Sequence, residues 1–259
     1  MTPMLLALTL ALAQAPPEKP SALPLVPGWT LATSFASPHA TQAAAADARF
    51  AYAVSNTHVA RHDRATGKLL GSGTAPDAKH LNSAFVWKGK VYCAHSNYPK
   101  RPEESDIRVF DPTADTLGVF HTFAKPPGSL VWCVRDPADE FWWCAFAHYG
   151  KDNAKSFVAK MDDKFVELAR WSFPKNVVAD FDGMSASGGL WDGDTLLVSH
   201  HHYRVPYRLK LPQAGNELEF VEALACPFPG QGIAADPASP GGLVGIDRTQ
   251  RTVVFAKAK

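Results

Sequence analysis

Three histidines of this sequence occupy the same place in a repeated pattern, in which apolar residues are followed by one small residue and then an imidazole. The pattern ends at His95, His148 and His200, and two further copies end at Asn56 and Asp247. Successive copies are separated by about 39, 53, 52 and 47 residues, a period that indicates a repeat architecture. Five polar side chains at one position of a five-fold repeat are expected to converge on one place.

Imidazoles from three repeats can bind a divalent metal, because neutral imidazole is a good ligand and a vacant coordination position can take water or substrate. We therefore predict a metal site formed by His95, His148 and His200. Zinc, manganese, iron, calcium and magnesium all stay open as the ion. Two other interpretations also stay open: acid–base chemistry without a metal, and a polar, water-filled channel whose side chains satisfy one another.

The residues between these copies have the character of short β-strands. From Gly28 onward, short apolar runs are punctuated by Gly, Pro, Asp and Asn, and no stretch shows a convincing amphipathic period of 3.6 residues. Five units of antiparallel strands are predicted, over residues 42–70, 82–123, 129–173, 184–225 and 232–256. Four-stranded units with this spacing are typical of a β-propeller, whose blades surround a central channel.

The fifth unit has only three strands, whereas an unpaired strand, 28–35, precedes the first unit. Pairing the two would close the ring and remove exposed sheet edges. We therefore predict an all-β, five-bladed propeller over residues 28–259, with four-stranded antiparallel blades and the last blade completed by the N-terminal strand.

In such a propeller the second strand of each blade ends at the face where the first strand begins, so the pattern residues should surround one mouth of the channel. We expect His80 and Asp182 to transfer protons there. The residues expected to contact substrate are Gln42, Asn56, Asn82, Tyr98, Trp132, Tyr149, Ser185, Arg204, Gln231 and Asp247. A core role for Trp132 is an equal alternative.

Two local details refine this picture. The residues before the pattern positions are small, as expected where strands crowd toward an axis: Ser55, Ala94, Ala147, Ser199 and Gly245. The run His200-His201-His202 can place at most two imidazoles in one site if the strand continues, because successive strand residues point to opposite faces. His201 is the one expected to point away.

The N-terminal residues resemble an export signal. Residues 1–13 contain a short apolar run and end in Ala11-Leu12-Ala13, which predicts a signal peptide and a secreted or periplasmic protein. Residues 14–27 are rich in proline and are interpreted as a linker. Cys133 and Cys144 lie on predicted neighbouring strands, so a disulfide and two buried thiols both stay open.

The composition limits the partners. Lysine and arginine (26) nearly balance aspartate and glutamate (25), and no dense basic run occurs. Nucleic acid and anionic membranes are therefore poor candidates. We expect a monomer that binds a small molecule or a carbohydrate.

The array of repeats, with the turn Asp111-Pro112-Thr113-Ala114-Asp115 between two strands, resembles NHL and streptogramin-lyase-like propellers. It also looks like secreted bacterial propellers described as cycloisomerase-like. In the lyase family a histidine at the channel mouth acts as the base in an elimination assisted by a divalent cation. That family has seven blades, however, and no motif transfers residue by residue.

The leading prediction is thus a secreted enzyme of lyase, cyclase or lactone-forming type. The first alternative is a non-catalytic propeller that binds a glycan or a peptide. The second is a five-bladed glycoside hydrolase, or an enzyme similar to glutamine cyclotransferase, whose blade motif Gly230-Gln231-Gly232 faintly resembles. A hydrolase would need inward-facing carboxylates, for which only Asp182 and Asp247 are well placed.

Overall fold

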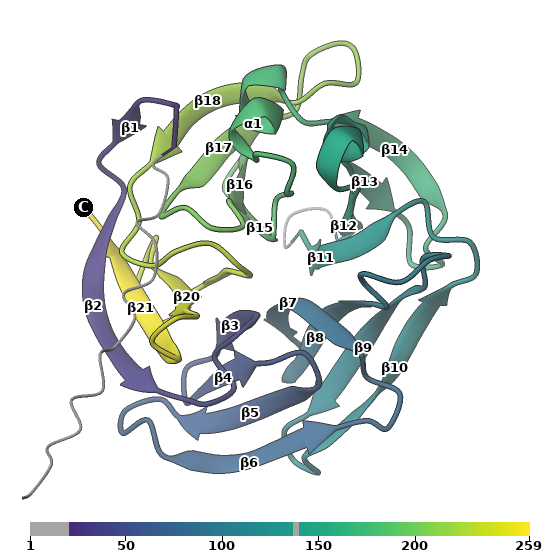
Figure 1. Ribbon diagram of the computed structural model, residues 1–259. Helices are drawn as coiled ribbons and strands as arrows, with labels where there is room; N and C mark the ends of the chain where they lie inside the picture. Colours follow the sequence, from purple (N-terminus) through teal and green to yellow (C-terminus); the bar gives the residue numbers. More distant parts are fainter. Residues whose placement is uncertain (1–20, 137–139) are drawn as a thin grey trace, which may run out of the picture.

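The computed structural model, which describes residues 21–136 and 140–259, is a ring of five antiparallel sheets around a central axis. The predicted five-bladed β-propeller is confirmed (Figure 1). In blades one to four the strands follow one another outward from the axis in chain order, whereas the outermost strand of blade five is β2 (Figure 1). Successive strands of a blade are hydrogen-bonded antiparallel neighbours, as short connections require.

Blade one comprises β3 (Ala43–Ala46), β4 (Phe50–Val54), β5 (His58–Asp63) and β6 (Leu69–Thr74). Blade two comprises β7 (His80–Trp87), β8 (Lys90–Ser96), β9 (Ser105–Asp111) and β10 (Thr116–Phe123). Blade three comprises β11 (Ser129–Arg135), β12 (Trp142–Ala147), β13 (Phe157–Met161) and β14 (Glu167–Ser172). Blade four comprises β15 (Gly188–Asp192), β16 (Thr195–Ser199), β17 (Pro206–Lys210) and β18 (Glu219–Leu224).

Blade five closes the ring as predicted. It consists of β19 (Ala234–Ala235), β20 (Leu243–Asp247), β21 (Thr252–Ala258) and the N-terminal strand β2 (Trp29–Ala36). The register pairs Trp29 with Ala258 and Ala36 with Thr252, and the Trp29 indole donates a 2.7 Å hydrogen bond to the carbonyl of Gly241. This pairing satisfies the outer edge of β21, which would otherwise be exposed.

The segment before β2 is attached to blade four. Strand β1 (Leu25–Val26) pairs in parallel with β18 and gives that sheet a fifth strand. The carboxylate of Asp180 accepts hydrogen bonds from the Ser21 hydroxyl and the Ala22 N–H. Part of the expected linker, 21–27, is therefore seated on the propeller, whereas the predicted signal peptide, 1–13, and residues 14–20 lie outside the described residues.

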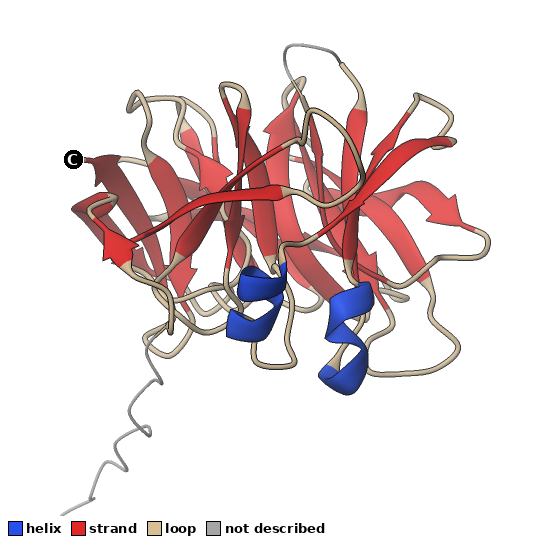
Figure 2. Cartoon of the chain, turned by 90° about the horizontal axis from the view of Figure 1, so that it is seen from above, coloured by secondary structure: helices blue, strands red, loops and turns tan. Residues whose placement is uncertain are grey.

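Two short helices depart from the strand pattern. A 3-10 helix at Gly150–Lys155 lies between β12 and β13, and α1 (Lys175–Asp180) lies between β14 and β15. Both project from the same face of the ring (Figure 2). Each has six residues, so neither is long enough to show a helical period in the sequence.

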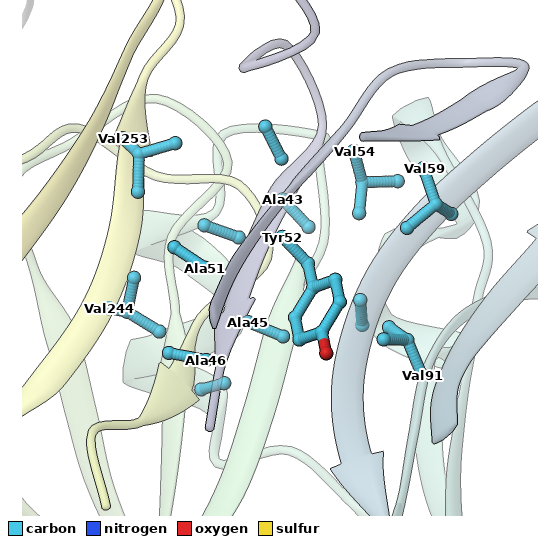
Figure 3. Packing of buried hydrophobic residues seen from close by; sticks show 14 of the residues in the cluster. Ala43, Ala45, Ala46, Ala51, Tyr52, Val54, Val59, Val91, Val244 and Val253 are labelled. Carbon is cyan, nitrogen blue, oxygen red and sulfur yellow. The ribbon is translucent and has the colours of Figure 1, made fainter. Parts of the chain in front are cut away.

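Small residues let the inner strands approach the axis. One buried cluster contains the four alanines of β3 together with Tyr52, Val91 and Val244 (Figure 3). A Cβ added at Gly232 would lie 2.6 Å from the Cβ of Ala43, and one at Gly188 would lie 2.5 Å from the backbone nitrogen of Ile233. At Gly245, one of the small residues before the pattern positions, an added Cβ would overlap the ring of Phe228.

Cys133 and Cys144 are directly opposite each other on β11 and β12, so the predicted neighbourhood of their strands is confirmed. All four cysteines are free and buried. Burial raises the pKa of the Cys133 thiol well above its usual value. Within the described residues, no helix has the length and apolar character needed to span a membrane.

Candidate functional site

A cavity of about 140 Å³, lined by residues from all five blades, lies on the axis at the predicted mouth of the channel. We call it the central cavity. The residues that line it come from the beginnings of inner strands and from the loops that follow second strands, as expected for this face. They are Gln42, His80, Asn82, Tyr98, Val131, Tyr149, Met184, Ser187, His201, Gln231 and Arg248.

Irregularities in two inner strands contribute to this lining. The β7–β8 register shifts between Leu81 and Ala84, which is where Asn82 lies. The β11–β12 register shifts between Leu130 and Trp132, which is where Val131 lies. Such bulges change the direction of a side chain beside a site. The Asn82 amide also donates a 2.7 Å hydrogen bond to the carbonyl of Leu130, which joins blades two and three at the cavity wall.

The blade-five side of the cavity has an unusual backbone. Gln231 has a φ of 64°, a conformation that a residue with a Cβ adopts rarely, and it lies between two glycines. Its side-chain amide donates a 2.9 Å hydrogen bond to the carbonyl of His201, across the blade boundary. A residue held in this conformation at the wall of a cavity is a feature of functional sites.

His80 offers an imidazole with no bound partner. Neither ring nitrogen has a hydrogen bond to any described residue, and the ring lies 5.6 Å from that of Tyr98. Burial, followed by the positive charges of Arg248 and His95, lowers the pKa of His80 to about 4. At neutral pH this side chain is therefore uncharged and can accept a proton or a hydrogen bond.

His201 is a second uncharged imidazole, and it is held in place. Its Nδ1 atom lies 2.7 Å from the hydroxyl of Ser187. Burial, and then the nearby charges of His202 and Arg248, lower its pKa to about 3. The hydrogen bond to Ser187 fixes the ring, and His201 and Ser187 both line the central cavity.

Arg248 supplies a positive charge with no counter-ion. No described carboxylate lies within ion-pair distance of its guanidinium, whereas Asp247 beside it pairs with Arg204 at 3.2 Å. Arg248 is exposed as a residue, and partial burial of its guanidinium and then the charge of Arg251 lower its pKa, but an arginine stays charged at physiological pH. The charge is thus available to an anion from outside.

Two tyrosines complete the wall. The rings of Tyr98 and Tyr149 lie 4.5 Å apart, and Tyr98 is partly exposed at the rim. Burial raises the pKa of Tyr149 to about 12, so its phenol remains a hydrogen-bond donor. The hydroxyls of Ser129 and Ser185 lie against it. None of the eleven described residues that line the cavity is acidic.

The three histidines predicted to share a metal do not come together, which corrects that expectation. The Nε2 atom of His95 accepts a hydrogen bond from the Lys79 N–H, and its Nδ1 lies 3.0 Å from a carboxylate oxygen of Asp106. His95 is buried within blade two, where these contacts order the loop before β7. Both ring nitrogens of His95 are therefore in contact with groups of blade two or of the loop that leads into it.

Both ring nitrogens of His200 also have hydrogen-bond partners, in its own loop and in the helix that precedes β15. Its Nδ1 accepts hydrogen bonds of 2.8 Å from the N–H groups of His202 and Tyr203, and its Nε2 lies 3.0 Å from the Asp180 carbonyl. The ring stacks on Tyr203 with centroids 3.8 Å apart. His148 packs beside Gly128 at the edge of blade three. Residues 21–136 and 140–259 contain no group of three or more His, Cys, Asp or Glu side chains arranged to hold a metal ion.

Some of the other predicted site residues line the central cavity, and others lie outside it or in the core. His80, Gln42, Asn82, Tyr98, Tyr149 and Gln231 line the central cavity. Asn56 lies just outside and its Oδ1 accepts a 2.5 Å hydrogen bond from the Gln42 amide. Trp132 is fully buried against Gly189, so the core alternative for this residue is correct.

Both predicted carboxylates lie away from the cavity. Asp182 borders a separate surface hollow near α1, and Asp247 caps the next turn by accepting a hydrogen bond from the Gln250 N–H. Arg204 binds the Pro227 carbonyl and Asp247. Ser185 is buried behind Tyr149. The expectation that Asp182 transfers protons at the cavity is therefore corrected.

The sequence pattern missed three lining residues whose side chains can take part in binding or catalysis: His201, Arg248 and Ser187. His201 was expected to point away because strand alternation was carried past Ser199, where β16 ends. The signal for Arg248 was its place directly after the pattern residue Asp247.

The comparisons with known proteins support the fold alone. No protein-family model matches the chain, and no curated protein matches it. A PQQ-bound aldose sugar dehydrogenase from Streptomyces coelicolor is similar, with 11% identity, a TM-score of 0.56, and coverage of 92% of this chain and 100% of that one.

Two weaker similarities were also found. The hydrazine synthase of Kuenenia stuttgartiensis has 10% identity and a TM-score of 0.44 over 82% of this chain and 69% of that one. A chain of the mitotic checkpoint complex has 8% identity and a TM-score of 0.46 over 83% of this chain. This chain spans 63% of the length of that one.

Proposed function

We propose that the protein binds a small carboxylate in the central cavity and performs acid–base chemistry on a carbon next to that carboxylate or next to a carbonyl joined to it. The observation that carries this proposal is the uncompensated guanidinium of Arg248 in a cavity that also holds the unpartnered imidazole of His80. A carboxylate is a natural partner for guanidinium, because the two form parallel charge-assisted hydrogen bonds.

The size of the cavity agrees with a small ligand. A cavity of about 150 Å³ accommodates a molecule such as benzene, and the central cavity has about 140 Å³. A carboxylic acid of about six non-hydrogen atoms therefore fits without rearrangement, whereas a folded peptide or an oligosaccharide does not.

The chemistry follows from the charges. His80 takes a proton from the carbon beside a carboxylate or carbonyl, and the electron pair moves onto oxygen to form an enolate. Arg248 and the phenol of Tyr149 stabilise that negative charge. The pair then takes a proton back at carbon, or it expels a leaving group from the adjacent carbon, which receives the proton held by His80, in an elimination. In a ring closure the pair bonds to a carbonyl carbon of the same ligand, whose oxygen takes the displaced pair and the proton from His80. These are the lyase and cyclase reactions that the sequence suggested, here carried by side chains of this chain.

A bound carboxylate also adjusts the basicity of His80. Burial, and then the charge of Arg248, lower the pKa of His80 in the empty cavity, and the negative charge of a bound carboxylate opposes the charge of Arg248. The pKa of His80 therefore rises when the ligand binds, toward the neutral range in which a general base is efficient.

Isotope exchange tests this proposal without knowledge of the natural substrate. The protein is incubated in D₂O with 2-oxobutyrate and a panel of small 2-oxo, 2-hydroxy and unsaturated acids, and loss of C–H signal is followed by NMR. We expect exchange above the buffer rate, and loss of exchange in His80→Asn. His121→Asn, on the outer strand β10, is the matched control.

The outcome also separates the rival functions. Binding without exchange would favour a non-catalytic binding propeller, for which the adjacent rings of Tyr98 and Tyr149 are the supporting feature. Failure of every carboxylate to bind would overturn the proposal. A glycoside hydrolase is less well supported, because the described residues that line the cavity provide no carboxylate pair.

We further propose that the protein is exported to the periplasm or the medium and is a monomer. N-terminal sequencing of the natural protein would check the export, and sedimentation would check the oligomeric state.

A further inference from the structure

A second hollow adjoins the central cavity on the mouth face, between blades one and five. It is an open groove of about 500 Å³, which we call the side groove, and Arg248 borders both hollows. The residues that line it are Pro38, His39, Thr41, Ser55, Asn56, Thr57, His58, Arg248 and Arg251. None of these nine described residues is acidic.

Basic side chains gather in the side groove. Arg251 is an exposed residue, and it donates a 2.9 Å hydrogen bond from Nη1 to the Pro38 carbonyl, which anchors one end of its guanidinium. It follows Arg248 by three residues, across the turn after β20. The rings of His39 and His58 lie 5.2 Å apart on the opposite wall.

This arrangement contrasts with the other arginines near the ring. Arg64 pairs with Asp236 at 2.6 Å, and Arg108 pairs with Asp77 at 2.8 Å. Arg208 similarly pairs with Asp192 at 2.8 Å. Within the described chain, Arg248 and Arg251 have no such partner, and after burial it is the charge of Arg251 that lowers the pKa of Arg248. Like charges held together beside a hollow favour binding of an anion.

The two hollows are connected by polar groups. Asn56 borders the side groove, and its Oδ1 accepts the hydrogen bond from Gln42, which borders the central cavity. Arg248 is the residue that lines both hollows, so its guanidinium is the group that a ligand spanning the two would contact.

We propose that the side groove is a second anion subsite, so that the substrate is a short dianion. One carboxylate lies in the central cavity with Arg248, and the second anionic group, a carboxylate or a phosphate, lies against Arg251. This inference rests on the proposed function, because it extends the ligand of the same site.

Isothermal titration with an isosteric pair tests the second subsite. Glutarate and glutaramate have the same shape, but glutaramate carries an amide in place of one carboxylate. We expect glutarate to bind about tenfold more tightly, as a charge-assisted hydrogen bond to Arg251 provides. The preference should fall below about threefold in Arg251→Gln and persist in Arg251→Lys, which keeps the charge. Thermal melts of both variants check folding.

Two further measurements complete the test. Arg49→Gln removes one positive charge at the opposite end of the channel, in the β3–β4 turn, and should keep the full preference. 3-Phosphonopropionate identifies the second group: tighter binding than glutarate assigns a phosphate to the subsite, and weaker binding assigns a carboxylate.

Equal affinity for glutarate and glutaramate, with binding of both weakened by Arg248→Gln, would overturn the second subsite and leave the proposed function intact. If neither acid bound in a manner sensitive to Arg248→Gln, the proposed function and the subsite would fall together.

Discussion

The Nδ1 atom of His201 and the hydroxyl of Ser187 lie 2.7 Å apart, and this contact holds one imidazole of a three-histidine run at the wall of the central cavity. The preceding His200 is fully buried and bonded to its own loop. Two adjacent histidines of blade four thus have different roles, one in the architecture and one at the site. The predictions below separate such roles experimentally.

Removal of the Arg248 charge should weaken carboxylate binding without destabilising the fold. In Arg248→Gln we expect the affinity for 2-oxobutyrate to fall about tenfold, as expected for loss of a charged hydrogen-bonding partner. The melting temperature should stay within about 2 °C of the wild type, because no described ion pair is lost. Titration calorimetry and thermal melts measure the two effects, with Arg49→Gln as the matched loss of charge. A large fall in melting temperature would instead assign Arg248 a structural role.

Carboxylate binding should take up protons. The pKa values of His80 and His201 are lowered to about 4 and about 3 in the empty cavity, and a bound anion raises both. The state that binds ligand therefore holds more protons, so affinity increases as pH falls from neutral toward about 4, the pKa of His80 in the empty cavity. Calorimetry in two buffers of different ionisation enthalpy counts the protons. His80→Asn should reduce the uptake, and a pH-independent affinity would contradict the prediction.

Stability should fall in mild acid because of His200. Burial lowers its pKa to about 4, whereas the unfolded chain has a value near 6.5. Between these values the unfolded state binds more protons, so protonation favours unfolding as pH falls from 6.5 to 4. The contribution of this group is at most about 3 kcal/mol, from the size of the shift. Urea unfolding at pH 7 and pH 4.5 measures it. His200→Asn, which retains an acceptor for the loop N–H groups, should show a smaller difference between the two pH values.

The carboxylate of Asp180 should be essential for attachment of the N-terminal segment. It accepts hydrogen bonds of 2.6 Å from the Ser21 hydroxyl, 2.7 Å from the Ala22 N–H and 2.5 Å from the Tyr207 hydroxyl. Asp180→Ala leaves the buried Tyr207 phenol unsatisfied, which should cost about 2–4 kcal/mol. Urea unfolding gives the loss.

Limited proteolysis provides a second measurement on the same variant. Cleavage between residues 20 and 27 should become faster in Asp180→Ala, because β1 loses its anchor to blade four. Asp194→Ala, an exposed change in the β15–β16 turn, is the control. Equal cleavage rates in wild type and Asp180→Ala would show that β1 pairing alone holds the segment.

The sequence by itself determined the architecture. Strand periodicity, turn residues and the spacing of the small-then-polar pattern are local properties, and they were enough for the blade count, the closure by β2 and the identity of the mouth. His80, Gln42 and Gln231 could be assigned to the central cavity because they stand at or near the beginnings of inner strands, which propeller geometry places at the axis.

The tertiary structure alone decided which side chains at that mouth are free. His95, His200 and Asp247 hold the predicted positions, but their polar atoms are taken by the backbone or side chains of their own and neighbouring loops. Whether a buried polar group is satisfied depends on groups brought close by folding, and residue spacing does not record that. Arg248 is identified as the unpaired positive charge of the central cavity for the same reason. Only the folded ring shows that no described carboxylate lies within ion-pair distance of it.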